Sequence, residues 1–440
     1  MLTSTLVSLV LAAPPAPGAE PGPWTLDQAI DYAQRRNPDA VTAVQRIARA
    51  EAALDEANAT FWPQLQLGAR YAVTDNPAAV FANLVNQEVL DFQATDFNDL
   101  DAIDNLNLNA RVDLPLYAGG ARFAARRAAH AGRAAAADSS EAIQHELGFQ
   151  TARAYLSVLE ARAFVEAAEA AVGSFEANLG IAQQRFEAGT LLKQDLLDIQ
   201  VRLSRAREDR VRARNAEALA LRALANVMGL PEDAAAPTLA EETPSLAVPA
   251  GSGAPQRPEI EALEHRIEQA TAGVNRARAG YIPTVGAFSS FMFDQGFVED
   301  GNRFSYMAGV AVEWKVFDGL GTPARVRQAQ AEIGVTEQAL RKTRLGISLQ
   351  VEQARIRLED AVERLGVTER EIELAEESAQ LTRDRFREGL AIATQLIDAE
   401  TALTVARVRR ANSRIARLLA LAELRRALGL PIADTAPDGE

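Results

Sequence analysis

The chain has 440 residues, of which 48% are hydrophobic, so it can bury a core in one elongated domain or in several ordinary ones. Its 60 acidic and 46 basic residues give a net charge of −14, which excludes the basic surface that a nucleic-acid partner requires. The absence of cysteine excludes disulfides, thiolate metal sites, cysteine nucleophiles and lipid attachment through cysteine.

The first 19 residues have the character of a leader. An apolar run at 6–13 is followed by a proline-rich stretch that ends at Gly18-Ala19, and this pattern predicts a secretory signal peptide. A disordered leader is the alternative. No other apolar run reaches the roughly 18 residues of a membrane-spanning helix.

The rest of the chain is a tandem duplication. Residues 61–65 (FWPQL) match 281–285 (YIPTV), and residues 37–39 (NPD) match 257–259 (RPE) at the same spacing. Later matches have a shorter constant spacing, so the first half holds about 20 extra residues between Leu65 and Val112. The sequence therefore divides into a signal peptide (1–19), a first repeat (20–231), a linker rich in Ala, Pro, Glu and Gly (232–256), a second repeat (257–431) and a short tail (432–440).

Each repeat is predicted to contain a helix, a strand, a loop, a strand, a very long helix, a turn and a helix. Residues 121–187 contain no proline and are rich in Ala, Arg, Glu and Leu, which predicts one helix of about 100 Å. Apolar residues from Phe149 to Ala163 recur at steps of three and four, as a helix packed along one side requires. The other predicted helices are 25–60, 192–228, 259–280, 324–387 and 393–428.

Four segments alternate with a period of two instead. They are the predicted strands 64–74 and 106–117 in the first repeat and 282–294 and 304–317 in the second. In three of them apolar residues form one face and polar residues the other. The third strand is less regular, because Phe288 and Met292 fall on the face that should be polar.

Strands of about ten residues with one apolar and one polar face are typical of a membrane β-barrel wall. A half-buried sheet of a soluble protein is the alternative, but the long helices leave no compact core to cover the apolar faces. Four strands cannot close a barrel, since small barrels need about eight, and open edges are not tolerated in lipid. The chain is therefore expected to self-associate, and three copies would supply twelve strands.

Several motifs resemble the TolC-type outer-membrane efflux family. They are the Pro before each first strand (Pro63, Pro283), the strand end LPLYAGG (114–120), and the helix-turn pairs RFEAGTLLKQDLLDIQ (185–200) and RFREGLAIATQLIDAE (385–400). The resemblance covers nearly the whole chain after the leader. It implies a mostly helical homotrimer in the outer membrane of a Gram-negative bacterium, with a 12-stranded β-barrel in lipid and a periplasmic helical barrel.

In function, the resemblance implies a channel subunit of a tripartite efflux or type I secretion system that passively conducts small molecules or ions. Its expected partners are a periplasmic adaptor and an inner-membrane pump, often of the resistance-nodulation-division type. Drugs, metal cations, solvents and proteins are all compatible cargoes, because specificity belongs mainly to the pump. No cofactor, metal or catalytic residue is expected.

The resemblance places the functional residues at the two helix-turn pairs. Helix starts just past the turns line a closed aperture, and the adaptor contacts the same tips. The aperture candidates are Asp195, Asp198, Gln395 and Asp398. The turn and adaptor-contact candidates are Arg185, Gly189, Arg385 and Gly389. Gln395 departs from the acidic residue of some members, so the ring expected from Asp398 carries less charge.

Each site residue has a structural alternative. Asp195 and Asp198 can cap a helix and complement its dipole, and this role is as well supported by the sequence as aperture lining. Arg185 and Arg385 can pair across the tip or remain solvated. Both glycines fit the left-handed position that closes a helix.

The long first loop, residues 75–105, is acidic, which is compatible with attraction of a hard cation at the pore mouth. Its spacing matches no metal-binding loop, and a surface loop that folds over the barrel is the favoured interpretation.

Two other classes of protein compete with a channel. An enzyme is disfavoured because His130, His145 and His265 lack paired ligand spacing and no nucleophile or phosphate-binding motif occurs. A soluble coiled-coil scaffold would account for the Ala/Glu/Arg-rich helices, but not for the four strands and the leader.

Overall fold

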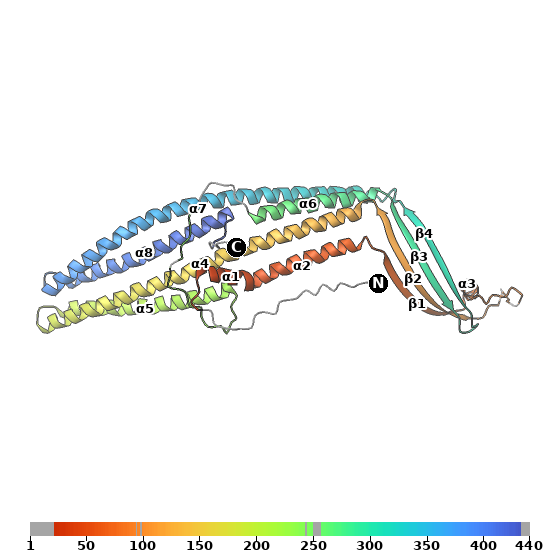
Figure 1. The fold of residues 1–440 in the computed structure, drawn as a ribbon. Helices are drawn as coiled ribbons and strands as arrows, with labels where there is room; N and C mark the ends of the chain where they lie inside the picture. Colours follow the sequence, from red (N-terminus) through yellow and green to blue (C-terminus); the bar gives the residue numbers. More distant parts are fainter. Residues whose placement is uncertain (1–21, 94, 97–98, 243, 250–256, 433–440) are drawn as a thin grey trace, which may run out of the picture. The chain divides into compact units, whose positions relative to one another are not determined.

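The structure, a computed structural model, describes residues 22–93, 95–96, 99–242, 244–249 and 257–432. The predicted signal peptide and most of the tail lie outside the described residues. The elements in chain order are α1 (Leu26–Arg36), α2 (Pro38–Ala59), β1 (Gln64–Thr74), α3 (Pro77–Asn86), β2 (Ile103–Ala118), α4 (Ala121–Glu187), α5 (Lys193–Met228), α6 (Pro258–Arg278), the short 3₁₀ helix η1 (Ala279–Tyr281), β3 (Thr284–Gln295), β4 (Asn302–Glu313), α7 (Gly321–Glu388) and α8 (Ala393–Leu428). Figure 1 shows their connection.

The chain is thus mostly helical with one small sheet, as the sequence predicted. It separates into two compact units, each built from both repeats. Unit 1 takes residues 1–41, 143–256 and 348–440, and unit 2 takes residues 42–142 and 257–347. The units cut across the duplication because α4 and α7 each begin in unit 2 and end in unit 1. No helix in the described part of the chain has an apolar stretch sufficient to cross a membrane.

The predicted helix 25–60 is two helices. Thr25 caps α1, with its hydroxyl accepting from the Gln28 backbone N–H and the Gln28 side chain accepting from the Thr25 N–H. The helix stops at Asn37 because the Pro38 ring disfavours a helical conformation in the residue before it. The Asn37 side chain then donates to the Val227 carbonyl at 2.8 Å, which fixes the break against α5.

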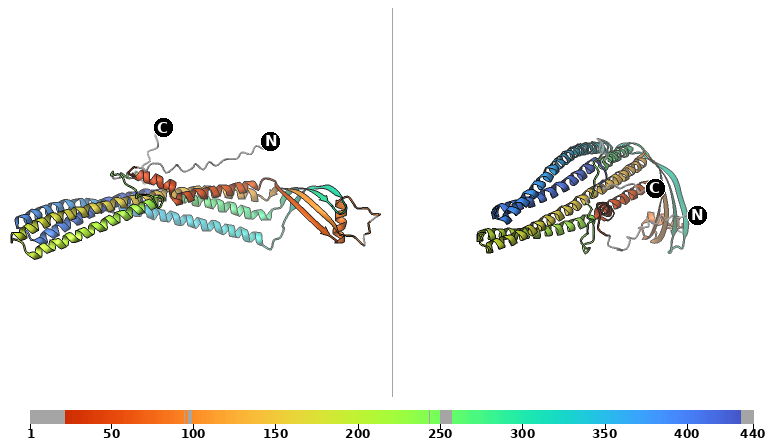
Figure 2. Two further views of the ribbon diagram at one scale, coloured as in Figure 1. Left: turned by 90° about the horizontal axis from the view of Figure 1, so that it is seen from below. Right: turned by 60° about the vertical axis from the view of Figure 1, so that its left-hand side comes forward.

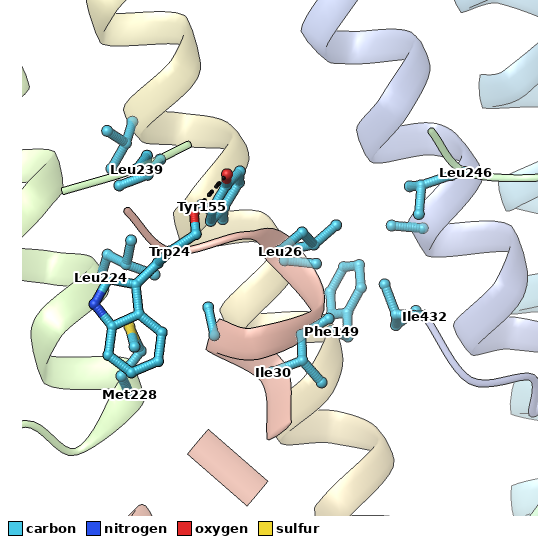
Figure 3. Close-up of a cluster of buried hydrophobic side chains, with 14 of the residues drawn as sticks. Trp24, Leu26, Ile30, Phe149, Tyr155, Leu224, Met228, Leu239, Leu246 and Ile432 are labelled. Carbon is cyan, nitrogen blue, oxygen red and sulfur yellow. Dashed lines mark hydrogen bonds between the residues drawn. The ribbon is translucent and has the colours of Figure 1, made fainter. Parts of the chain in front are cut away.

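The described part of the linker, residues 232–242 and 244–249, packs within unit 1. The backbone N–H of Trp24 donates to the Thr238 carbonyl at 2.7 Å, and the Trp24 carbonyl accepts from the Ala240 N–H at 2.9 Å. Leu239 and Leu246 are buried in the main core of unit 1. Figure 3 shows these side chains around Trp24 and Phe149, with the Tyr155 hydroxyl donating to the Trp24 carbonyl at 3.1 Å.

Unit 2 contains an antiparallel sheet in the order β1-β2-β3-β4 (Figure 1). Its register aligns Gln64 with Asp113, Asp113 with Phe288, and Phe288 with Gly309, which places one polar face across all four strands. Phe288 and Met292 do lie on this polar face. Phe288 is accommodated because its partner is Gly309, and the Phe288 ring occupies the space where a Cβ of residue 309 would stand.

Besides the first helix, two further predictions differ from the structure. β4 ends at Glu313, whereas a strand to residue 317 was expected. β3 begins only at Thr284, so β4 has no partner beyond that pair, and Trp314 instead donates from its indole to the Tyr281 carbonyl at 3.2 Å. The long first loop contains a helix, α3, where the sequence pattern predicts no helix.

Candidate functional site

The first feature of the candidate site is the pair of turns that join α4 to α5 and α7 to α8. Both turns lie at one end of unit 1, where the two helical hairpins run side by side (Figures 1 and 2). Gly189 and Gly389 have φ angles of +74° and +82°, the left-handed conformation expected from the sequence. The Thr190 N–H donates to the Arg185 carbonyl and the Leu390 N–H to the Arg385 carbonyl, both at 2.8 Å, which closes each helix in the same way.

The aperture candidates occupy the first two turns of the helices that follow, with Asp195 and Gln395 in the first turn and Asp198 and Asp398 in the second. Asp195 and Asp198 are half-buried on α5, and Gln395 and Asp398 are exposed on α8. Gln395 accepts from the Ile392 backbone N–H at 3.3 Å, so its side chain caps α8. No hydrogen bond or ion pair is found for the three aspartates among the described residues, and Leu192, the residue before α5, provides no side-chain cap.

Capping therefore accounts for Gln395 but not for the aspartates. Among these, only Asp195 is in a first turn, where its carboxylate complements the helix dipole. The structure brings the four residues to the same end of the two hairpins, next to a buried cluster that includes Ile199, Leu396 and Ile397.

The two arginines have different environments despite their equivalent positions. Arg185 donates from Nη1 to the Phe386 carbonyl at 2.8 Å, and its guanidinium lies 4.9 Å from the centroid of the Phe386 ring. It also donates to the Thr190 carbonyl at 3.3 Å. Arg385 is exposed, and no partner for it is found in the part of the chain that the structure describes. Of these two arginines, only Arg185 has a contact with the other hairpin among the described residues.

A second connection was not expected from the sequence. Glu400 on α8 is 2% exposed, and its Oε1 accepts from Asn178 Nδ2 on α4 at 3.1 Å. Arg383 Nε on α7 lies 3.5 Å from the same oxygen. One carboxylate therefore joins three helices, which is the arrangement that allows a charge to be buried without a large penalty. The sequence feature that could have revealed this connection is a polar residue on an apolar helix face, as Glu400 lies between Ile397 and Leu403.

The tip is also apolar on its surface. Leu192, Leu390 and Ile392 flank the turns and are 71%, 73% and 62% exposed. Phe186 is exposed, whereas its counterpart Phe386 is fully buried under Arg185. Large apolar side chains gathered at an exposed helix end are typical of a contact surface for another protein.

The second feature of the candidate site is the apolar face of the sheet. It comprises Leu65, Leu67, Tyr71 and Val73 on β1, and Phe304, Tyr306, Val310 and Val312 on β4. Every one of these side chains is more than half exposed, up to 79% for Phe304. An uncovered apolar surface of this extent is unfavourable in water, so a lipid or protein environment must cover it.

One histidine lies beside carboxylates. His265 Nε2 lies 3.7 Å from Asp138 Oδ2, and burial raises the pKa of the Asp138 carboxyl, while the neighbouring His265 opposes the shift. The described residues contain no cluster of three or more side chains able to hold a metal ion.

The described residues thus form long helical hairpins and a four-stranded antiparallel sheet with an exposed apolar face. Comparison with known proteins identifies the family. Residues 29–230 and 254–430 match the model of the outer membrane efflux protein family, and the chain belongs to that family. It is accordingly an outer-membrane protein of the TolC type, and proteins of this family are channels rather than enzymes.

Individual relatives agree with this assignment. The chain is 29% identical to protein CyaE of Bordetella pertussis over 267 residues, which are 58% of this chain and 56% of CyaE. It is 25% identical to the pyoverdine export outer membrane protein OpmQ of Pseudomonas putida, over 92% of this chain and 85% of OpmQ. The structure of a membrane protein from Pseudomonas aeruginosa has the same fold, with a TM-score of 0.80 at 20% identity over 95% of this chain and 96% of that one.

Proposed function

We propose that three copies of the chain assemble into an outer-membrane duct that passively conducts small molecules or ions. The main support for this proposal is the sheet, whose apolar face is exposed. Its outer strands, β1 and β4, each have a partner on one side only within the described residues. Exposed strand edges are too costly in lipid, because their backbone N–H and C=O groups find no water there. Three sheets joined edge to edge leave no open edge, with the polar face inside and the apolar face toward lipid.

The alternation of the two faces gives a direct test. The chain has no cysteine, so single cysteines can be introduced without a background. In proteoliposomes, a water-soluble maleimide should label Gln66→Cys, on the polar face, much faster than Leu67→Cys, on the apolar face. Equal labelling of the two variants would contradict a membrane barrel.

The oligomeric state has a separate test. In detergent, the unheated protein should migrate on a denaturing gel as a trimer that dissociates on boiling, and light scattering should give three chain masses per particle. A water-soluble monomer that needs no detergent would instead support a scaffold protein.

At the helix tips, the proposal is that Asp195, Asp198, Gln395 and Asp398 line the periplasmic aperture. Support comes from their common position at the end of unit 1 and from the three aspartates having no partner among the described residues. Repeated around a threefold axis, these carboxylates form a narrow ring of like charge, which attracts cations.

The same tips are proposed to receive a periplasmic adaptor, which connects the duct to an inner-membrane pump of the resistance-nodulation-division or a related type. Arg185, Gly189, Arg385 and Gly389 shape the turns, and the exposed Leu192, Leu390 and Ile392 offer the apolar contact. A photoreactive amino acid at Leu390 should crosslink to the adaptor in cells, whereas the same group at the exposed Phe297, on the β3–β4 turn, should not.

A further inference from the structure

The segment between β1 and β2 has a structure of its own. We define residues 77–90 as the α3 segment. Its helix begins with Pro77 after Asn76, whose side chain accepts from the Ala79 N–H at 3.2 Å. The second repeat passes from β3 to β4 through residues 296–301 alone, so it has no equivalent of this segment. The extra residues of the first repeat therefore form a distinct folded element.

The α3 segment lies on the polar face of the sheet. Val80 and Leu84 are buried together with Ile103 of β2, and Gln87 donates to the Asn105 side chain at 3.1 Å. Ile103 and Asn105 share the face of β2 that carries Asn107. The side chains of Asn105 and Asn107 both donate to one carboxylate oxygen of Asp294 on β3, at 2.7 and 2.8 Å, which confirms that they point to the same side.

The end of the segment is held tightly against the β3–β4 turn. Gln87 is 1% exposed, and its Nε2 also donates to the Asp104 carbonyl at 2.7 Å. Glu88 forms an ion pair with Arg303 at 2.8 Å. Gly296 and Gly301 lie against residues 87–89 so closely that a Cβ on either would overlap the Gln87 side chain or carbonyl oxygen. The contact therefore depends most on glycine at position 301, where the Cβ would meet backbone, whereas at position 296 it would meet only the end of the Gln87 side chain.

We infer that the α3 segment is a lid on the inner wall of the pore, which narrows its outer mouth and limits the size of solute that passes. The inference rests on the proposed function, in which the polar face lines the pore. Ile103, the residue against which α3 packs, stands at the end of β2 that is distant from α4, so the lid lies at the mouth remote from the helices.

The dimensions allow an effective closure. Twelve strands about 4.8 Å apart and tilted by about 40° enclose a barrel about 24 Å across, measured between backbones. A helix with its side chains is about 10 Å wide. Three such helices, one from each copy, would therefore occupy most of the mouth.

The test compares Gly301→Ala, whose new methyl group must displace residues 87–89, with Gly286→Ala as control. Gly286 lies on the same polar face, and a Cβ there meets nothing closer than the Leu114 carbonyl at 3.8 Å. In planar bilayers, Gly301→Ala should raise the single-channel conductance about twofold or more, and Gly286→Ala should leave it unchanged. In a Leu84→Cys background, Gly301→Ala should also speed the labelling of the introduced cysteine by a soluble maleimide, because residue 84 is buried while the α3 segment is in place.

A second variant removes the lid altogether by replacing residues 75–102 with the turn sequence of residues 296–301. It should conduct at least as well as Gly301→Ala and admit larger polyethylene glycols. Unchanged conductance in this variant would contradict the lid. So would unchanged conductance in Gly301→Ala if faster labelling of Leu84→Cys shows that the α3 segment has moved. If the unmodified trimer forms no channel, the proposed function fails instead, so the two failures are distinguishable.

Discussion

The connection between the two hairpins through Asn178 and Glu400 gives a quantitative prediction. Asn178→Ala removes the amide that donates to the Glu400 carboxylate, and both groups are 2% exposed, so water cannot replace the lost bond. A hydrogen bond to a charged group contributes about 1.5–3 kcal/mol. Arg383 retains its contact with the same oxygen, so we expect a loss of about 2 kcal/mol in the free energy of local opening.

Hydrogen exchange followed by mass spectrometry measures this opening. A loss of about 2 kcal/mol corresponds to exchange about 30-fold faster in peptides around residues 175–200, since each 1.4 kcal/mol is a factor of about ten. Asn215→Ala, an exposed asparagine on α5, is the matched control and should leave these rates unchanged. Rates in Asn178→Ala within about threefold of the unmodified protein would show that the buried bond does not hold the hairpins together.

Three further predictions concern the tips and α4. The double variant Asp195→Ala with Asp398→Ala should weaken the cation preference of the purified trimer in a planar bilayer but raise its conductance, because the smaller side chains widen a narrow aperture. Unchanged current with unchanged cation preference would reject the aperture assignment. Gly389→Ala should lower stability in thermal unfolding by about 1–2 kcal/mol, because residue 389 has φ +82°, whereas Gly346→Ala, within α7, should stabilise by up to about 1 kcal/mol. The raised pKa of Asp138 means that the folded state binds its proton more tightly than the unfolded state, so stability falls as pH rises above the ordinary value of 3.8 and through the folded pKa. Asp138→Asn should therefore stabilise the protein at neutral pH and flatten this part of its stability curve, and a variant equal to the unmodified protein in denaturant titrations at pH 7 would contradict that reasoning.

Much of the fold follows from local patterns. The helix over 121–187 was predicted from composition and the absence of proline, and α4 spans Ala121–Glu187. Strand 64–74 was predicted from alternation, and β1 spans Gln64–Thr74. Both are long, regular segments whose periodicity repeats over many residues, so a few irregular positions do not change the interpretation.

The errors have identifiable causes. The break at Asn37 in the first helix was missed although Pro38 signalled it, because the apolar period continues on both sides. Helix α3 lies in a segment for which the sequence predicts a loop, because its ten residues are too few for a clear period. The end of β4 depends on where its partner strand begins, which no local signal in β4 itself contains.

At the candidate site, the sequence identified the two turns because they recur at equal positions in both repeats. It could not distinguish the repeats from one another. Phe186 and Phe386, like Arg185 and Arg385, occupy equivalent motifs, yet only Phe386 is buried and only Arg185 binds across to the other hairpin. The partnership of Asn178 with Glu400 joins residues far apart in the chain, so neither residue reveals it alone.

The sequence by itself determined the duplication, the long helices, the two-faced strands and the glycine turns. These features depend on interactions between residues near one another in the chain, which leave a period or a motif that can be counted. Only the tertiary structure decided which of two equivalent side chains is buried, that Asn178 pairs with Glu400, and that the α3 segment lies on the polar face of the sheet. Those outcomes depend on which elements pack together, and packing follows from the shape of the whole chain rather than from any one segment.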